Sequence, residues 1–126
     1  MKKEFSKFWI SSKQPRKQRK YRYNAPLQIR QAFVSAHLSK ELRKKYNKRN
    51  IILRKGDKVK IMRGQFKNKI GKVEKVNLKK ITVFVEGIQI TKKDGSKTNI
   101  PIHPSNLLIT ELNLEDKHRR EILERK

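Results

Sequence analysis

The feature that most constrains the fold is a series of short apolar runs that begins at Ile51 and is interrupted by glycine-containing turns. In several runs valine and isoleucine alternate with lysine, which is the period of a strand with one buried face. Asp94-Gly95 is a strong signal for a hairpin turn. Four to five short strands within about 60 residues are typical of a small closed barrel. The sequence therefore predicts a mainly β fold with a small SH3-like barrel over residues 51–112.

The strands of this barrel are predicted from turns and from apolar spacing. A turn at Gly56-Asp57 precedes one alternating run. A later run carries apolar residues at a spacing that breaks strict alternation, which indicates a β-bulge between positions 70 and 76. The predicted interior residues are Val59, Ile61, Val73, Val83 and Val85.

Residues 25–50 precede the barrel and are predicted to form two short helices. Asn24 is the expected cap of the first helix, and Pro26 falls in its first turn, where a missing N–H costs little. Ser39 is the expected cap of the second helix. These helices have too few apolar positions for a bundle, so we expect them to pack against the barrel.

Residues 113–126 follow the barrel and are predicted to form a terminal helix. Asn113 is the expected cap, acidic residues fill the first turn, and basic residues end the helix. Leu114, His118 and Ile122 would lie on one face of it.

Residues 1–24 are predicted to form a basic extended arm. The segment "SKQPRKQRKYRYN" has neither helical nor strand periodicity, and a segment of this composition does not order by itself. Tyr21 and Tyr23 lie among its cations, and aromatic rings in such a setting can stack on nucleic-acid bases.

The charge of the chain is large and unevenly distributed. The formal net charge is +24. Residues 1–50 hold 16 Lys and Arg and 2 acids, residues 51–110 hold 14 and 4, and residues 111–126 hold 5 and 5. Such an excess repels itself unless a polyanion neutralises it. We therefore expect a polyanion contact on the first two segments that largely spares the third.

Catalysis is not indicated. His37, His103 and His118 fall in three different predicted elements, with no carboxylate spaced to orient any of them. There is no cysteine, and the glycine-containing stretch at 63–73 lacks the Gly-Lys-Ser/Thr of a nucleotide-binding loop. We expect no enzyme activity, no cofactor, no metal site and no small-molecule substrate.

Nucleic acid and an anionic membrane are the two candidates for the polyanion, and the membrane is the weaker one. A polybasic tail can bind anionic lipid, and Phe5, Phe8 and Trp9 could insert. However, the basic charge continues through the barrel, where a membrane anchor would need none. The apolar run near the start is interrupted by Lys7, and no stretch of about 18 apolar residues follows. We expect a soluble intracellular protein without membrane contact.

The stretch "RGQFKNKIGKV" at residues 63–73 is interpreted as a nucleic-acid-binding hairpin loop. Gly64 and Gly71 would bracket the loop and let a sugar-phosphate backbone approach. Asn68 suits the left-handed region. The backbone N–H groups would meet phosphates, and Phe66 and Ile70 would turn back to the barrel. The cations that the loop would present are Arg63, Lys67 and Lys69.

These residues carry a resemblance to a known family. "GDKVKIMRGQFKNKIGKVEKV" resembles a KOW motif, a hairpin of SH3-like barrels in ribosomal proteins and transcription elongation factors. With the flanks "SAHLSKEL" and "IHPSNL", the chain from Ser11 onward resembles large-subunit ribosomal protein twenty-four of archaea, twenty-six in eukaryotes. Two departures stand out: Asn68 occupies a position where the motif often has glycine, and the first ten residues match nothing in the family. The long leading arm favours an archaeal or eukaryotic source over a bacterial one, with archaeal favoured.

The resemblance implies a cytoplasmic, structural constituent of the large ribosomal subunit. Such a protein binds the 5′ region of large-subunit rRNA early in assembly and lies near the polypeptide exit tunnel. Its expected partners are large-subunit rRNA, neighbouring large-subunit proteins, and nascent chain or targeting factors at the tunnel exit. The residues expected to contact RNA are Lys13, Arg16, Lys17, Arg19, Lys20, Tyr21, Arg22 and Tyr23 in the arm, and Lys55, Arg63, Gly64, Lys67, Lys69 and Gly71 in the barrel.

Two alternatives to this interpretation stay open. One is a KOW-type transcription elongation module, against which the missing αβ domain of elongation factors argues. The other is a non-ribosomal nucleic-acid chaperone. Sedimentation would separate them from a ribosomal protein, which stays with the large subunit through a high-salt wash.

Overall fold

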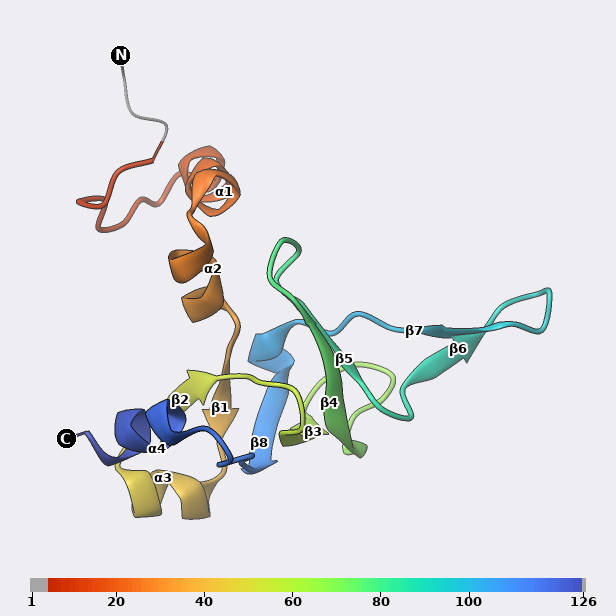
Figure 1. The fold of residues 1–126 in the computed structure, drawn as a ribbon. Helices are drawn as coiled ribbons and strands as arrows, with labels where there is room; N and C mark the ends of the chain where they lie inside the picture. Colours follow the sequence, from red (N-terminus) through yellow and green to blue (C-terminus); the bar gives the residue numbers. More distant parts are fainter. Residues whose placement is uncertain (1–4, 126) are drawn as a thin grey trace.

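The computed structural model describes residues 5–125. Their elements, in chain order, are α1 (Pro15–Asn24), α2 (Leu27–Phe33), β1 (Ser35–Leu38), α3 (Lys40–Tyr46), β2 (Asn50–Ile52), β3 (Lys58–Ile61), β4 (Ile70–Asn77), β5 (Thr82–Val85), β6 (Gln89–Thr91), β7 (Lys97–Asn99), the 3-10 helix η1 (Pro104–Asn106), β8 (Leu107–Glu111) and α4 (Lys117–Glu124). Figure 1 shows α1 and α2 above the sheet, and the β6–β7 hairpin extending to the right, beyond β4 and β5.

Six strands form one mixed sheet in the order β2-β1-β8-β3-β4-β5, and β6 and β7 form a separate hairpin. The β1–β8 pair is parallel, and the other pairs are antiparallel. The mainly β prediction is confirmed, but the predicted closed barrel is not seen. Within residues 5–125 the two edge strands β2 and β5 do not pair with each other. Instead, β5 makes a single bridge from Val83 to Ile102, in the segment that returns from the hairpin.

The predicted interior residues form the middle of the core. Val59, Ile61, Val73, Val83 and Val85 are all at most 2% exposed. They pack with other buried residues from β1 and β8. Burial of each such side chain contributes about 1.5–3 kcal/mol to folding, so this cluster is the main source of the sheet's stability.

Two turn and strand irregularities appear where the sequence predicts them. The register between β4 and β5 shifts between Val73 and Lys75, which is the predicted bulge. The chain turns at Gly95 with a φ of +84°, and Asp94 accepts hydrogen bonds from the backbone and hydroxyl of Ser96. These bonds hold the pKa of the Asp94 carboxyl below its usual value, chiefly through the hydroxyl.

The prediction for residues 25–50 was right about two short helices but missed the strand between them. In β1, Ala36 and Leu38 are buried while His37 is exposed, an alternation too short to be seen against the helical pattern. Ser39 caps α3 as predicted, because its Oγ accepts the N–H of Leu42.

The start of the first helix was placed wrongly. Pro26, not Asn24, is the cap residue of α2. Asn24 is instead the last residue of α1.

The prediction of an arm without periodic structure was wrong for residues 15–24, which form α1. Pro15 occupies the first turn, where its fixed φ and absent N–H suit a helix start. No residue of α1 is buried. The sequence of residues 15–24 shows no helical periodicity. Contacts with the segments before and after α1 are therefore needed to explain why these residues form a helix.

The terminal helix begins four residues later than the predicted start. Asp116 caps α4 by accepting the N–H of His118 at 2.9 Å, whereas Asn113 accepts the N–H of Glu115 in the preceding turn. Leu114 lies before α4, so of the predicted face only His118 and Ile122 are in the helix, and both are exposed. The residues that α4 buries are Arg119 and Leu123.

Candidate nucleic-acid interface

The first candidate surface is α1. Its cations Arg16, Lys17, Arg19, Lys20 and Arg22 are all exposed, and so is Lys13 just before the helix. Among residues 5–125, none of these side chains is paired with a carboxylate. The helix extends beyond α2, away from the sheet (Figure 1). Its five positive charges within ten residues are therefore open to an external polyanion.

The two tyrosines of α1 differ in what they can contact. Tyr21 is half-buried, and its ring stacks on Trp9 with 4.3 Å between centroids. Stacking of Tyr21 on a base would first need this contact to open. Tyr23, in contrast, is 78% exposed. Of the two, only Tyr23 presents a ring that can stack on a base without rearrangement.

The second candidate surface is the loop between β3 and β4, residues 62–69. Gly64 and Asn68 adopt φ of +92° and +70°, so the predicted left-handed turn residues are confirmed. The N–H of Asn68 donates to Ile61 O, and the N–H of Met62 donates to Asn106 O in η1, both at 2.8 Å. The loop is therefore fixed to β3 on one side and to η1 on the other.

The side chains of this loop divide largely as predicted into exposed cations and an aromatic ring that packs against the core. Arg63, Lys67 and Lys69 are exposed, and Phe66 packs partly against the core, as predicted. Ile70 was predicted to turn inward, and this is wrong, because the side chain is 55% exposed at the start of β4. The cations of the loop are thus accessible to a partner.

Several backbone donors of the loop are used internally, contrary to the prediction that they meet phosphates. The N–H groups of Lys67 and Lys69 donate to Gly64 O and Phe66 O, so they cannot also point at a phosphate. A phosphate bound at this loop would therefore be contacted mainly by side chains. One of these, Lys69, lies over the Phe66 ring with Nζ 5.0 Å from the centroid, which orients its charge.

Gly71 does not bracket the loop, because it lies within β4 opposite Val59. A Cβ added there would lie 2.6 Å from Glu86 O and 2.8 Å from a methyl of Val85. The close approach of the end of β5 and of Glu86 is therefore sufficient to require glycine at this position. Lys55 is exposed in the turn that ends at Gly56.

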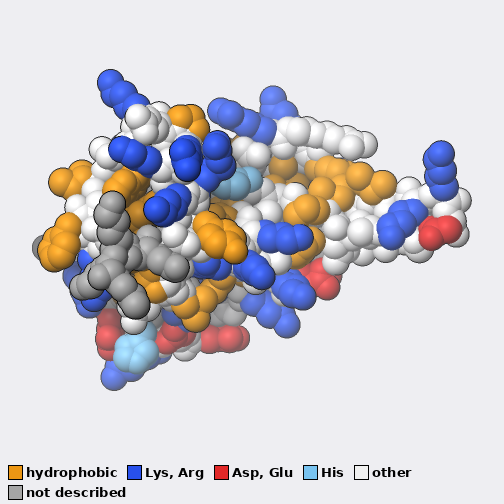
Figure 2. Space-filling view, turned by 90° about the horizontal axis from the view of Figure 1, so that it is seen from above, with side chains coloured by type: hydrophobic (Ala, Val, Ile, Leu, Met, Phe, Trp, Pro, Cys, Tyr) orange, Lys and Arg blue, Asp and Glu red, His pale blue; other side chains and the backbone are white. Residues whose placement is uncertain are grey.

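Among the exposed lysines that were not predicted contacts, three lie close together in the sequence. Lys92, Lys93 and Lys97 lie at the outer end of the β6–β7 hairpin. The segment "TKKDGSK" could have indicated these lysines, because residues on both sides of a tight hairpin turn lie together at its tip. Figure 2 shows Lys and Arg side chains there and across the central face in this view.

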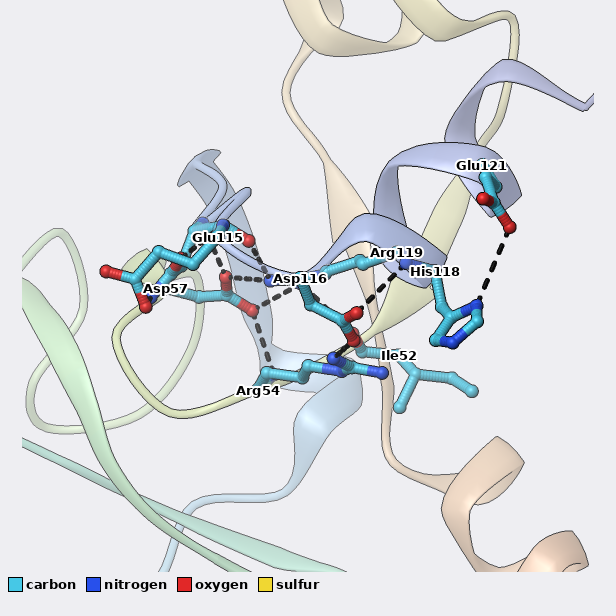
Figure 3. Close-up of polar contacts among 9 residues, drawn as sticks. Ile52, Arg54, Asp57, Glu115, Asp116, His118, Arg119 and Glu121 are labelled. Atoms are coloured by element: carbon cyan, nitrogen blue, oxygen red, sulfur yellow. Dashed lines mark hydrogen bonds and ion pairs between the residues drawn. The ribbon is translucent and has the colours of Figure 1, made fainter.

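The acidic side chains are instead concentrated near α4 and the turns that meet it. Asp57 and Arg119 form a buried pair with two contacts of 2.6 Å (Figure 3). Asp116 pairs with Arg54, and Lys58 with Glu111. The hydrogen bond from Arg54, and then the N–H of His118, hold the pKa of Asp116 below its usual value. These carboxylates therefore neutralise cations near α4 and not the cations of α1 or of the 62–69 loop.

The histidines lie in separate elements, as expected. Nδ1 of His103 accepts the N–H of Ser105 and so caps η1, and His118 lies 3.6 Å from Glu121. Within residues 5–125 no group of three or more His, Cys, Asp or Glu side chains could hold a metal ion. In the same part of the chain, each helix is too short or too polar to span a bilayer.

Comparison with known proteins agrees with this picture. Residues 12–126 match the model of a family described as ribosomal proteins L26 of eukaryotes and L24 of archaea. The chain belongs to this family. It is also 52% identical over 115 residues to the large ribosomal subunit protein uL24 of Methanosphaera stadtmanae, an alignment that covers 91% of this chain and 98% of that protein. The predicted resemblance is thereby confirmed for the ribosomal family, and the match begins after the first eleven residues.

Proposed function

We propose that the chain is a structural constituent of the large ribosomal subunit and binds large-subunit rRNA. Membership of a ribosomal protein family, and the name of the relative from Methanosphaera, support the subunit assignment. Membership also implies a cytoplasmic, ribosomal location. The proposed role is structural, with no catalytic step.

The observation that carries the RNA-binding part is the separation of charge. The cations of α1 and of the 62–69 loop are exposed and have no carboxylate partner among the described residues, whereas Arg54, Lys58 and Arg119 do. Cations position a protein on RNA through phosphates, and the shape of the RNA decides the fit. In this proposal the β3–β4 hairpin acts as the KOW element of an SH3-like fold. It contacts one rRNA surface while α1 contacts another.

The finer assignments rest on the family resemblance. They are binding to the 5′ region of the rRNA, action early in subunit assembly, and a position near the polypeptide exit tunnel. Neighbouring large-subunit proteins are the further partners proposed. Nascent chain or targeting factors would be met only if the position near the tunnel is right.

Sedimentation of tagged protein from cells of the source organism tests the proposal. The expected result is co-migration with the large subunit through a high-salt wash, with crosslinks to large-subunit rRNA from α1 and from the loop. Co-migration with RNA polymerase would favour a transcription elongation module instead. Release by the wash, with crosslinks to many RNAs, would favour a nucleic-acid chaperone.

A further inference from the structure

The sequence of α1 does not explain why this segment is helical. The helix has ten residues, of which five are Lys or Arg and none is acidic or buried. Isolated helices shorter than about 12–15 residues are marginal in water. Like charges three and four positions apart, such as Arg16 with Lys20, lower helix stability further. Contacts outside the helix must therefore stabilise it.

The contacts come from an aromatic cluster formed by Phe5, Trp9, Tyr21 and Phe33. Tyr21 of α1 lies at its centre, with ring centroids 4.3 Å from Trp9, 4.9 Å from Phe5 and 6.1 Å from Phe33 of α2. All four residues are half-buried. Since Tyr21 is the one α1 residue in the cluster, Phe5 and Trp9 hold the helix through a single ring.

Three hydrogen bonds, made by two side chains, fix the ends of the same helix. At the C-terminal end, Arg30 donates Nε–H to Ala25 O at 2.8 Å and a second N–H to Tyr23 O. The last carbonyls of a helix lack partners within it, and a cation satisfies them and the helix dipole. Near the N-terminal end, the Gln18 side chain donates to Ser12 O at 2.7 Å. The segment before α1 is thus folded back along the helix.

We propose that residues 5–9 act as a clamp that keeps α1 helical in the free protein and so fixes the spacing of its cations for RNA. Trp9 is a positioning residue in this scheme, since it acts through Tyr21 rather than on RNA. A cation array that is already ordered loses less conformational entropy on binding. The clamp lies before residue 12, where the family match begins. The inference rests on the proposed RNA-binding function for its effect on affinity, but not for its effect on the helix.

Trp9→Ala is the direct test, with Phe8→Ala as the matched control. Phe8 is an aromatic residue of the same segment but is 93% exposed and lies outside the cluster. Amide exchange of residues 15–24 is measured in the free full-length protein, and affinity for an rRNA fragment is measured at several salt concentrations. Trp9→Ala should speed exchange in α1 by roughly tenfold, because the opening of the helix becomes easier. Phe8→Ala should leave exchange within about twofold of wild type.

The affinity measurement has an equally specific expectation. Trp9→Ala should weaken RNA binding by roughly three- to tenfold, since the helix must then be ordered on binding. The slope of log affinity against log salt should not change, because no charge is removed. Trp9→Phe keeps a ring against Tyr21, so both its amide exchange in α1 and its RNA affinity should stay close to wild type.

Trp9 is the single tryptophan of the chain, so its fluorescence reports the clamp by itself. Tyr21→Ala should shift the emission to longer wavelength and increase quenching by iodide, as expected for a ring that becomes exposed. The same spectra for Phe8→Ala should match wild type.

Each outcome decides the inference. Unchanged exchange in Trp9→Ala would overturn the clamp whatever happens to binding. Faster exchange with unchanged affinity would overturn its role in RNA recognition. Equal affinity losses in Trp9→Ala and Phe8→Ala would show direct contact with RNA by this segment instead. A changed salt slope would mean that the number of phosphates contacted depends on Trp9, which would overturn the account in which only the cost of ordering the helix changes. If the α1 cations prove irrelevant to RNA, the proposed binding surface fails, and the exchange data still decide the clamp.

Discussion

At the scale of single residues, the buried pair of Asp57 and Arg119 is the most consequential feature outside the apolar core. Arg119 is 2% exposed and also donates to Asn113 O and Ile52 O, while Asp57 accepts the N–H groups of Arg54 and Asn113. These bonds join α4, the β2–β3 turn and the segment after β8. A buried pair of this kind is costly to break, because the remaining charge has no partner.

Arg119→Ala should therefore lower the free energy of unfolding by about 3–5 kcal/mol. Urea denaturation is the measurement, and Arg120→Ala is the control, since the neighbouring arginine is exposed on the same helix. The control should change stability by less than about 0.5 kcal/mol. Similar losses in the two variants would mean that Arg119 does not form the buried pair in solution.

Glycines 64 and 71 offer a second prediction, because they are needed for different reasons. Gly71→Ala should cost about 1–3 kcal/mol of stability, since the new methyl group meets the backbone oxygen of Glu86. Gly64→Ala should cost about 1–2 kcal/mol from its positive φ alone, because space at that site is open.

Crystal structures of the two glycine variants separate these reasons. A shift of the segment after β5 is expected for Gly71→Ala, and none for Gly64→Ala. If the segment keeps its position in Gly71→Ala, the close approach does not explain the glycine.

At the scale of elements, local patterns predicted the structure where they were long enough to be specific. Valine or isoleucine occupies every second position of β3 and β5 over the whole strand, so the core was predictable, and Asp94-Gly95 indicated a hairpin. In contrast, β1 has four residues and is defined by pairing with β2 and β8, which are distant in the chain. Such tertiary pairing leaves no local signal.

The errors in the predicted helices have a similar explanation. The face that α4 buries depends on Arg119 reaching Asp57, and a pattern of apolar residues cannot show that an arginine is the buried one. The helical state of α1 depends on rings at Phe5, Trp9 and Phe33, outside the helix. The cations of both candidate surfaces were predictable from the sequence. The packing of Tyr21 against other aromatic rings of the chain was not.

The start of α4 gives a pH-dependent prediction. The pKa of Asp116 is held below its usual value near 3.8 by Arg54 and by the N–H of His118. Since the folded-state pKa is the lower one, its contribution to stability is complete above about 3.8 and is lost as the pH falls through the lowered value.

Asp116→Asn should therefore be less stable than wild type at neutral pH, and the difference should shrink under acid conditions. Thermal unfolding across the acid range measures this, with Glu124→Gln as a control for an exposed carboxylate of the same helix. A difference that stays constant with pH would contradict a role for the ionised Asp116.

At the scale of the whole molecule, charge is divided by element. The acids pair with cations around α4, and the segment 111–126 is neutral by composition. The cations of α1, the 62–69 loop and the β6–β7 hairpin are left without acidic partners among the described residues. The sequence already indicated which segments carry the excess. The sequence could not indicate that the cations of α1 and those of the 62–69 loop lie on separate surfaces. This separation depends on the position of α2, which places α1 away from the sheet (Figure 1).

A salt titration tests most directly the central claim, which is that the cations of α1 contact rRNA phosphates. Arg16, Lys17 and Arg19 are replaced by glutamine, a good helix former, in one variant. The control replaces Lys117, Arg120 and Arg125, which are also two arginines and one lysine and are exposed in or next to α4. Affinity for a fragment from the 5′ region of large-subunit rRNA is measured at several salt concentrations.

The α1 variant should bind more weakly than wild type, with a log–log slope that is shallower by up to about 0.9 for each phosphate that is no longer neutralised. The control should keep the wild-type slope, because the segment around α4 is neutral by composition. Equal slopes in the two variants would contradict the central claim, since charge removed from α1 would then matter no more than charge removed from the neutral side of the molecule.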